Sequence, residues 1–257
     1  MLDAQWIEQR IVELKTAAGF LTRLPLLAPA APAAGELSRA LWSAPVVGLG
    51  IGVVGAAVYA IAFALHLPAL PAAALAVAAT MVATGALHED GLADVADGFG
   101  GGATPERKLE IMRDSRIGTY GVSALTLSLL LRIGALASIA HPGLVAAALV
   151  AAHAGGRAGL PAFMRLLPPA RADGMSAQAG TPPQEAAMVA AGIGIVIVLF
   201  ALGLAAGIVA AVLAVGALAF MAWLCGRQIQ GQTGDTLGAL EQATEIVVLL
   251  VAAAVLS

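Results

Sequence analysis

Acidic side chains gather in one short stretch of this otherwise apolar chain. Residues 88–116 hold seven of its sixteen acidic residues: Glu89, Asp90, Asp94, Asp97, Glu106, Glu110 and Asp114. Asp90, Asp94 and Asp97 are spaced i, i+4 and i+7, which places them on one face of a helix. Like charges on one face weaken a helix, whereas carboxylate oxygens suit a divalent cation such as Mg²⁺. The spacing therefore predicts a metal site, with a solvated acidic surface as the alternative.

Two further residues stand at the start of this predicted helix, beside an apolar run. Glu89 joins the three aspartates in the predicted metal-binding set. His88 joins them in the predicted catalytic set, because a neutral imidazole can accept a proton near pH 7. The alternative for His88 is a structural histidine that hydrogen-bonds its neighbours or supports a metal ligand.

A basic segment follows the acidic one. Thr104 and Pro105 have the residue types of a helix N-cap and first helical position. Guanidinium groups suit bidentate contact with phosphate oxygens. The predicted phosphate-binding residues of this segment are Arg107, Lys108, Arg113, Asp114 and Arg116. Alone, the segment would be an ordinary basic surface at the inner leaflet. Next to the carboxylates, it predicts a site for a metal and a diphosphate.

A second polar segment covers residues 226–245. Within it, Asp235, Gly238, Gln242 and Glu245 are spaced as one stripe of a helix. Asp235 is therefore a further candidate for the predicted site. Residues 165–185 form a third polar stretch, which predicts a loop.

The composition of the whole chain is that of a membrane protein. Of its 257 residues, 60% are hydrophobic and 11% are charged, with a net charge of −3. Mean hydropathy is +0.92. Soluble domains carry about 25% charged residues. These values exclude a water-soluble globule, a disordered chain and a nucleic-acid-binding protein, which needs a basic surface. The single cysteine, Cys225, excludes a disulfide within the chain.

Seven apolar runs predict six or seven membrane-spanning helices, since one span needs about 20 apolar residues. The runs are 41–66, 68–87, 121–140, 143–160, 186–203, 204–225 and 245–257. The last run is short for a span and could lie partly in the membrane interface.

The N-terminal residues 5–18 predict an amphipathic helix at the membrane surface rather than a signal peptide, with Trp6 and Ile7 on its apolar side. The predicted fold is an all-α, polytopic helical membrane bundle with catalytic loops on the cytoplasmic side. We expect one membrane-embedded domain over 1–257, with 88–120 as its acidic catalytic segment.

Lysine and arginine predict the orientation. The turns near 66–68, 140–143 and 203–205 contain neither residue, whereas the other connections carry many. The positive-inside rule places those basic connections, and the predicted site, in the cytoplasm. Two arginines lie inside apolar runs. Arg132 needs a polar partner there or must snorkel. Arg157 lies four residues after His153 on one helix face, and we add it to the phosphate-binding set.

Two long motifs and two terminal ones are shared with a known family. The stretches His88–Gly98 and Arg107–Gly121 closely resemble the cobalamin synthase family, the adenosylcobinamide-GDP ribazoletransferases. Phe20–Pro25 and Thr233–Ala239 are similar to its terminal signatures, so the resemblance runs from about residue 20 to 245. Arg23 and Asp235 lie in these signatures and join the predicted substrate-binding set.

The resemblance implies a multi-pass enzyme of the inner (cytoplasmic) membrane that depends on Mg²⁺. It would join adenosylcobinamide-GDP to α-ribazole, or to α-ribazole 5′-phosphate, and release GMP. The implied partners are these small molecules and the lipid bilayer, with no nucleic acid. A homo-oligomer, or a complex with other enzymes of cobalamin assembly, stays open.

Two other function classes are alternatives for this sequence. Asp94–Gly98 matches the opening of the CDP-alcohol phosphotransferase signature, but Gly101 and Gly102 stand where that signature has Ala-Arg. A transporter or divalent-cation channel would place its acids near the bilayer midplane in broken helices. Here we expect them at one membrane face, which argues against transport.

Overall fold

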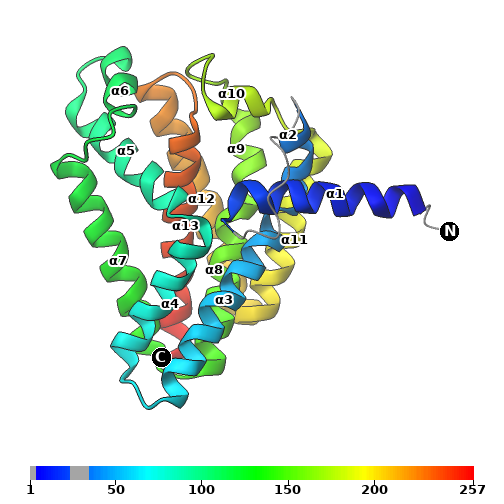
Figure 1. Ribbon diagram of the computed structural model, residues 1–257, viewed down its shortest axis with the longest axis vertical. Helices are drawn as coiled ribbons and strands as arrows, with labels where there is room; N and C mark the ends of the chain where they lie inside the picture. Colours follow the sequence, from blue (N-terminus) through cyan, green and yellow to red (C-terminus); the bar gives the residue numbers. More distant parts are fainter. Residues whose placement is uncertain (1–3, 24–34) are drawn as a thin grey trace.

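A computed structural model describes residues 4–23 and 35–257, and Figure 1 shows a bundle of helices with its long axis vertical. No strand forms within these described residues. The helices are α1 (Ala4–Leu21), α2 (Glu36–Ala40), η2 (Leu41–Ser43), α3 (Ala44–Ala64), α4 (Ala69–Thr84), α5 (Leu87–Gly101), α6 (Pro105–Ile111), α7 (Thr119–Ile139), α8 (Pro142–Ala158), α9 (Leu160–Leu166), α10 (Met175–Ala179), α11 (Gln184–Leu202), α12 (Leu204–Gln228) and α13 (Gly234–Leu256).

Six helical segments of the described chain are long and apolar enough to cross a membrane. They are Glu36–Ala64, Thr119–Ile139, Pro142–Leu166, Gln184–Leu202, Leu204–Gln228 and Gly234–Leu256. At 1.5 Å rise per residue, each is close to or longer than the roughly 30 Å hydrocarbon core of a bilayer. The protein is thus an all-α, multi-pass membrane bundle, as the sequence predicts.

The last spanning helix corrects a predicted boundary. The sequence predicts a short apolar run over 245–257 after a separate polar segment over 226–245, but α13 is one helix from Gly234 to Leu256. Glu241, Gln242 and Glu245 lie on its buried side. Polar groups inside a bundle can pair with one another, so a spanning helix can carry them.

The chain turns sharply between α4 and α5. The acidic segment follows directly after the apolar run 68–87 in the sequence, but α4 and α5 meet at 91°. Gly85 and Ala86 adopt left-handed backbone conformations, with φ of 65° and 55°, and these two residues turn the chain. α5 is not one of the six spanning segments, and it leads away from α4 toward the end of the bundle where α6 lies (Figure 1).

The apolar core forms where α3, α4, α7, α8, α11, α12 and α13 meet. Gly48 and Gly52 let α3 approach the backbone of α8 closely, because a Cβ at Gly52 would lie 2.7 Å from the Leu149 carbonyl oxygen. Small residues are the usual means of such contact between helices in lipid. α13 packs against α5, α7, α8 and α12, so it joins the core to the acidic helix.

The predicted N-terminal helix is confirmed as α1, which lies across the direction of the bundle helices (Figure 1). Trp6, Ile11 and Val12 are exposed. On the other side, the buried Glu13 accepts a hydrogen bond of 2.6 Å from Trp42 Nε1 and attaches α1 to the bundle. Leu24 and Pro25, the end of the N-terminal signature, lie outside the described residues.

Candidate active site

The predicted acidic helix is confirmed as α5, which we call the carboxylate helix (Leu87–Gly101). Asp90, Asp94 and Asp97 lie along it. Their side chains meet different surroundings, because Asp90 is exposed, Asp94 is half-buried and Asp97 is buried. The three carboxylates therefore do not form one equivalent set.

Asp97 holds the start of α7. Its two carboxylate oxygens accept hydrogen bonds from the backbone N–H groups of Gly118, at 2.7 Å, and Gly121, at 2.8 Å. The first N–H groups of a helix have no partner within the helix, so a carboxylate there satisfies them and complements the helix dipole. Asp97 thus has a structural role, whatever its part in metal binding.

The carboxylate groups of Asp90 and Asp94 make no hydrogen bond or ion pair within residues 4–23 and 35–257. Burial raises the pKa of Asp94 to about 7, and the nearby negative charges of Asp90, Asp235 and Asp97 act in the same direction. A half-buried carboxylate among like charges has the electrostatic setting of a cation site. Hard carboxylate oxygens fit Mg²⁺, which typically uses one or two of them together with substrate phosphates.

Asp235, at the start of α13, lies close to the carboxylate helix. Its Oδ2 accepts hydrogen bonds from Arg171 Nη2, at 3.0 Å, and from the Thr233 hydroxyl, at 3.1 Å. A Cβ at Gly91 would lie 2.7 Å from the Asp235 carbonyl oxygen, so the two helices touch through glycine. This contact brings Asp235 near Asp90 and Asp94.

On one side of Asp90 lies a cavity that we call the arginine cavity, about 460 Å³ in volume. Its charged and hydroxyl-bearing residues are Glu89, Asp90, Asp94, Arg113, Asp114, Ser115 and Arg116. Both arginines form ion pairs near its surface, Arg113 with Asp173 and Arg116 with Asp114. Two guanidinium groups next to two unpaired carboxylates can bind a diphosphate and a cation together.

The predicted basic helix is confirmed in part. Thr104 caps α6 by accepting a hydrogen bond from the Arg107 N–H at 3.3 Å. The helix ends at Ile111, so Arg113, Asp114 and Arg116 belong to the loop that follows. The hydrogen bonds from Arg116 lower the pKa of Asp114 to about 2, so this carboxylate stays ionised.

Arg107 and Lys108 lie apart from the arginine cavity, although the sequence places them in the phosphate-binding set. Arg107 is exposed and pairs with Glu110 at 2.8 Å. Lys108 is buried, with its side chain against Gly102. The turn at the end of α6 separates these two residues from Arg113 and Arg116.

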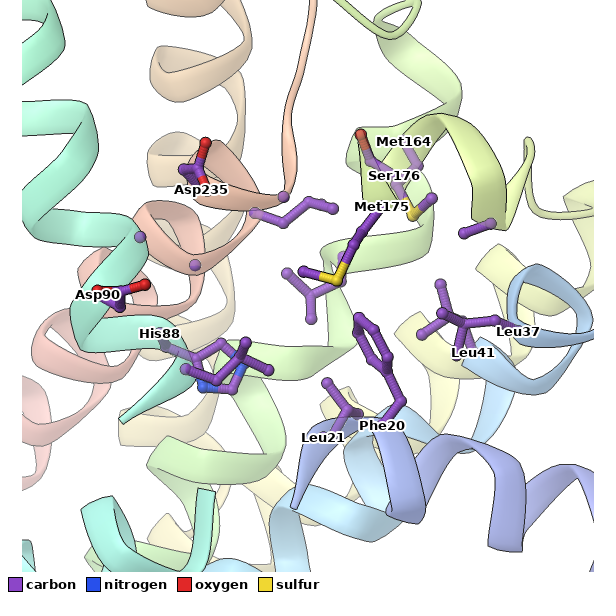
Figure 2. Close-up of a pocket in the computed structure, with 17 residues that line it drawn as sticks. Phe20, Leu21, Leu37, Leu41, His88, Asp90, Met164, Met175, Ser176 and Asp235 are labelled. Atoms are coloured by element: carbon purple, nitrogen blue, oxygen red, sulfur yellow. The ribbon is translucent and has the colours of Figure 1, made fainter. Parts of the chain in front are cut away.

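On the other side of Asp90 lies a second cavity, the apolar cavity shown in Figure 2. His88, Asp90 and Asp235 line one side of it, from α5 and α13. Phe20, Leu21, Leu37, Leu41, Met164 and Met175 line the facing side, from α1, α2, η2, α9 and α10. Asp90 lines both cavities, so it lies between two chambers of different polarity.

Beneath the two cavities, the bundle interior contains a network of buried charges. Arg132 pairs with Glu89 at 2.8 Å and with Glu245 at 2.7 Å, which confirms that this arginine has partners. Arg157 donates to Glu241 Oε1 at 2.6 Å. The remaining members are His88, Ser128, His153 and Gln242. Charges inside a membrane bundle are costly unless they are paired in this way.

Part of this network has the composition of a metal site. His153, Glu241 and Glu245 each offer a ligand atom within 4.8 Å of the others, and no other such group of three occurs among residues 4–23 and 35–257. However, Arg157 and Arg132 already neutralise the two glutamates. A divalent cation there would compete with two fixed positive charges, so we interpret this group as part of the ion-pair network.

The network also changes the interpretation of three predicted site residues. Arg157 is 1% exposed and is surrounded by protein groups, so it does not fit its predicted phosphate-binding role. Glu89 is buried against Arg132, although it also borders the arginine cavity. His88 faces the apolar cavity and has its Nδ1 3.3 Å from Arg157 Nη2.

Arg23, the remaining predicted substrate-binding residue, is exposed and lies over the turn between α4 and α5. Its side chain passes close to Gly85, where a Cβ would be 2.9 Å from the Arg23 Nε. It lines neither the arginine cavity nor the apolar cavity. It therefore stays a predicted contact at the edge of the site.

Sequence reasoning missed several residues that shape the site. Arg171 pairs with Asp235, and Glu241 pairs with Arg157. Met164 comes from α9, and Met175 and Ser176 come from α10, which lies within the stretch 165–185 that was expected to be a loop. The available signals for the pair of Arg157 and Glu241 were the acidic stripe of α13 and the arginine inside the fourth apolar run.

The chain is similar to a set of known proteins. A family model described as "Cobalamin-5-phosphate synthase" matches residues 13–253. Adenosylcobinamide-GDP ribazoletransferase from Bradyrhizobium diazoefficiens is 56% identical over 248 residues, which covers 96% of this chain and 95% of the relative. The protein of that name from Mesorhizobium japonicum is 56% identical, covering 93% and 91%. The one from Azorhizobium caulinodans is 46% identical, covering 93% and 94%. No solved structure matches the chain.

Proposed function

The chain belongs to the cobalamin-5-phosphate synthase family, and we propose that it is a membrane-embedded adenosylcobinamide-GDP ribazoletransferase that depends on Mg²⁺. The observation that carries the proposal is the pair of unpartnered carboxylates, Asp90 and Asp94, beside Arg113 and Arg116 in one cavity. The family membership argues against the two alternatives, a CDP-alcohol phosphotransferase and a transporter or channel.

The proposed reaction is a phosphoryl-group transfer. A ribose hydroxyl oxygen of α-ribazole, or of its 5′-phosphate, attacks one phosphorus of the diphosphate, the one that is bonded to the cobinamide oxygen. The bond from this phosphorus to the bridging oxygen breaks, and GMP leaves with that oxygen. The hydroxyl proton is released. Catalysis of such reactions depends mainly on positioning and on neutralising charge.

The arginine cavity is the proposed site of the diphosphate. Arg113 and Arg116 exchange their exposed partners, Asp173 and Asp114, for phosphate oxygens when the substrate binds. Exposed ion pairs contribute little stability, so this exchange has a low energetic cost. Ser115, between them in the sequence, offers a hydroxyl donor.

Asp90 and Asp94 are the proposed Mg²⁺ ligands, with Asp235 as a neighbouring carboxylate. A bound Mg²⁺ would neutralise negative charge on the diphosphate and on the departing GMP. Asp97 and Glu89, which the sequence places in the same ligand set, are held by backbone N–H groups and by Arg132. We therefore assign them mainly to positioning the carboxylate helix.

His88 is the proposed proton acceptor. Its side chain lines the apolar cavity next to Asp90. Its Nδ1 is 3.3 Å from the donor Nη2 of Arg157 and 3.8 Å from Glu241 Oε2. A nitrogen that accepts from Arg157 carries no proton, so Nε2 can accept the hydroxyl proton only in the other tautomer, in which the Nδ1 proton faces Glu241 instead. If His88 has only a structural role, His88→Ala protein will keep near-normal turnover across pH 6–9.

We propose that the protein lies in the inner membrane with this site facing the cytoplasm. The support is the excess of basic residues in the connections at the site's end of the bundle. Single cysteines at the exposed positions Ala103 and Gln230, in protein with Cys225→Ser, test the orientation. Labelling of either position by an impermeant reagent from outside would contradict it. A homo-oligomer or a complex with other cobalamin-assembly enzymes stays a prediction.

The activity is tested by incubating purified protein in detergent micelles with adenosylcobinamide-GDP, α-ribazole and Mg²⁺. We expect GMP release that requires both substrates and stops when the metal is chelated. GMP release that does not require α-ribazole would indicate a hydrolase. No release under any condition would contradict the proposed function.

A further inference from the structure

The apolar cavity has two chemically different sides, which Figure 2 shows facing each other. Phe20 and Met175 extend into it from α1 and α10, opposite Asp90 and Asp235. A ligand that suits this cavity has an apolar, preferably aromatic, part and a part that donates hydrogen bonds to carboxylates. A neutral nucleoside has both.

The charges that border this cavity exclude a phosphate-rich ligand. No lysine or arginine is among the described residues that line it, whereas Asp90 and Asp235 contribute two carboxylates, of which that of Asp235 is paired with Arg171. A diphosphate would meet like charge there. The arginine cavity, on the other side of Asp90, has both arginines. The two cavities therefore suit the two different substrates of a transfer reaction.

We propose that the apolar cavity binds the nucleoside acceptor, with its aromatic base against Phe20 and the methionines and its ribose toward Asp90 and His88. This inference rests on the proposed function, which names α-ribazole, a ribonucleoside with an aromatic benzimidazole base. Methionine sulfur and aromatic rings make favourable contacts with a flat ring.

The position of Asp90 indicates where the two substrates meet. Asp90 is the aspartate that lines both cavities, so a hydroxyl entering from the apolar cavity and a phosphorus held in the arginine cavity meet beside it. His88 lies on the acceptor's side, where the hydroxyl proton is released. The two substrates thus approach from opposite faces of the carboxylate helix.

The first test separates the two Michaelis constants. Phe20→Ala is expected to raise the KM for α-ribazole about tenfold and to change the KM for adenosylcobinamide-GDP less than twofold. Arg116→Gln, in the arginine cavity, is expected to do the reverse. Trp6→Ala is the matched control, because this aromatic residue of the same helix α1 is exposed outside the cavity. An unchanged KM for α-ribazole in Phe20→Ala would overturn the proposal.

A second variant distinguishes a loss of binding from misfolding of Phe20→Ala, which is a concern because Phe20 adjoins the buried Leu21. Met175→Ala shortens a side chain that is 55% exposed on the short helix α10, and it should also raise the KM for α-ribazole without lowering thermal stability. An effect of Met175→Ala on the KM for adenosylcobinamide-GDP alone would assign the cavity to the other substrate and overturn the proposal.

The binding step can be measured without catalysis. Titration calorimetry of α-ribazole into purified protein, with no adenosylcobinamide-GDP, should give binding that Phe20→Ala weakens about tenfold and Arg116→Gln leaves unchanged. If the protein binds α-ribazole in this pattern but releases no GMP, the proposed function fails and the cavity assignment stands. If GMP is released but Phe20→Ala and Met175→Ala bind α-ribazole like wild type, the cavity assignment alone fails.

Discussion

The Asp97 carboxylate accepts a hydrogen bond of 2.7 Å from the Gly118 N–H, so the carboxylate helix is tied to the end of the loop that carries Arg113 and Arg116. A second bond, from the Gly121 N–H at 2.8 Å, joins the same side chain to the first turn of α7. The two sets of site residues, acidic and basic, are therefore positioned relative to each other through one aspartate.

Asp97→Asn should destabilise the protein, because the amide NH₂ group faces a backbone N–H donor where the carboxylate oxygen accepted. Hydrogen bonds to charged groups contribute about 1.5–3 kcal/mol, so we expect a loss of about 2 kcal/mol of unfolding free energy. The measurement is unfolding in detergent micelles, together with hydrogen exchange of the Gly118 and Gly121 amides. Unchanged stability and unchanged exchange would show that these bonds are weak.

Gly91→Ala should separate the carboxylate helix from α13. Its Cβ would lie 2.7 Å from the Asp235 carbonyl oxygen, so one helix must move, at a cost of about 1–3 kcal/mol. We expect lower stability and at least a tenfold loss of GMP release. Gly134→Ala on α7 is the control, because nothing lies within 4 Å of its added Cβ. Equal behaviour of the two variants would contradict the close approach.

Arg132→Met should be strongly destabilising, because it leaves Glu89 and Glu245 without their cation in the bundle interior. Breaking a buried pair by removing one partner costs about 3–5 kcal/mol. Adding Glu245→Met to this variant should restore part of the stability, since one uncompensated charge is then removed. Membrane yield and thermal unfolding of the single and double variants measure this. A double variant less stable than the single one would refute the pairing.

Arg113→Gln should weaken donor binding, because the arginine cavity then has one guanidinium group fewer for the diphosphate. We expect the KM for adenosylcobinamide-GDP to rise about tenfold or more, given the usual contribution of a charge-assisted hydrogen bond. Arg227→Gln is the matched control, since Arg227 stacks near Trp223 away from both cavities. Steady-state kinetics with each substrate varied in turn would detect a failure of this assignment.

Local sequence patterns predicted the elements of the site well. The i, i+4, i+7 spacing of the aspartates and the Thr104-Pro105 pair each correspond to a helix in the structure. These signals are local, because helix periodicity and capping depend on residues within a few positions. Charge repulsion along α5, considered alone, does not reveal that Asp97 caps α7, a contact 21 residues away.

The long-range parts of the site could not be predicted in the same way. Arg157 and Glu241 are 84 residues apart, and only the packing of α8 on α13 brings them together. Without that pairing, the acidic residues of α13 predict a solvent-facing segment, so the last span was placed too late. The sequence pattern does not reveal the apolar cavity, because Leu, Met and Phe residues that line a cavity have the same hydropathy as those that face lipid.

If Asp90 and Asp94 bind Mg²⁺ for transfer of the phosphoryl group, Asp94→Asn must impair that transfer. The measurement is GMP release from adenosylcobinamide-GDP and α-ribazole by membrane-inserted, folded protein, titrated with Mg²⁺. Glu110→Gln, which removes an exposed acid on α6, is the control. We predict that Asp94→Asn releases GMP at least about a hundredfold more slowly, since each 1.36 kcal/mol of lost transition-state stabilisation is tenfold in rate. We also predict that it needs more Mg²⁺, while Glu110→Gln behaves as wild type. A wild-type rate with an unchanged Mg²⁺ dependence in Asp94→Asn would show that Asp94 does not bind the Mg²⁺ used in the transfer.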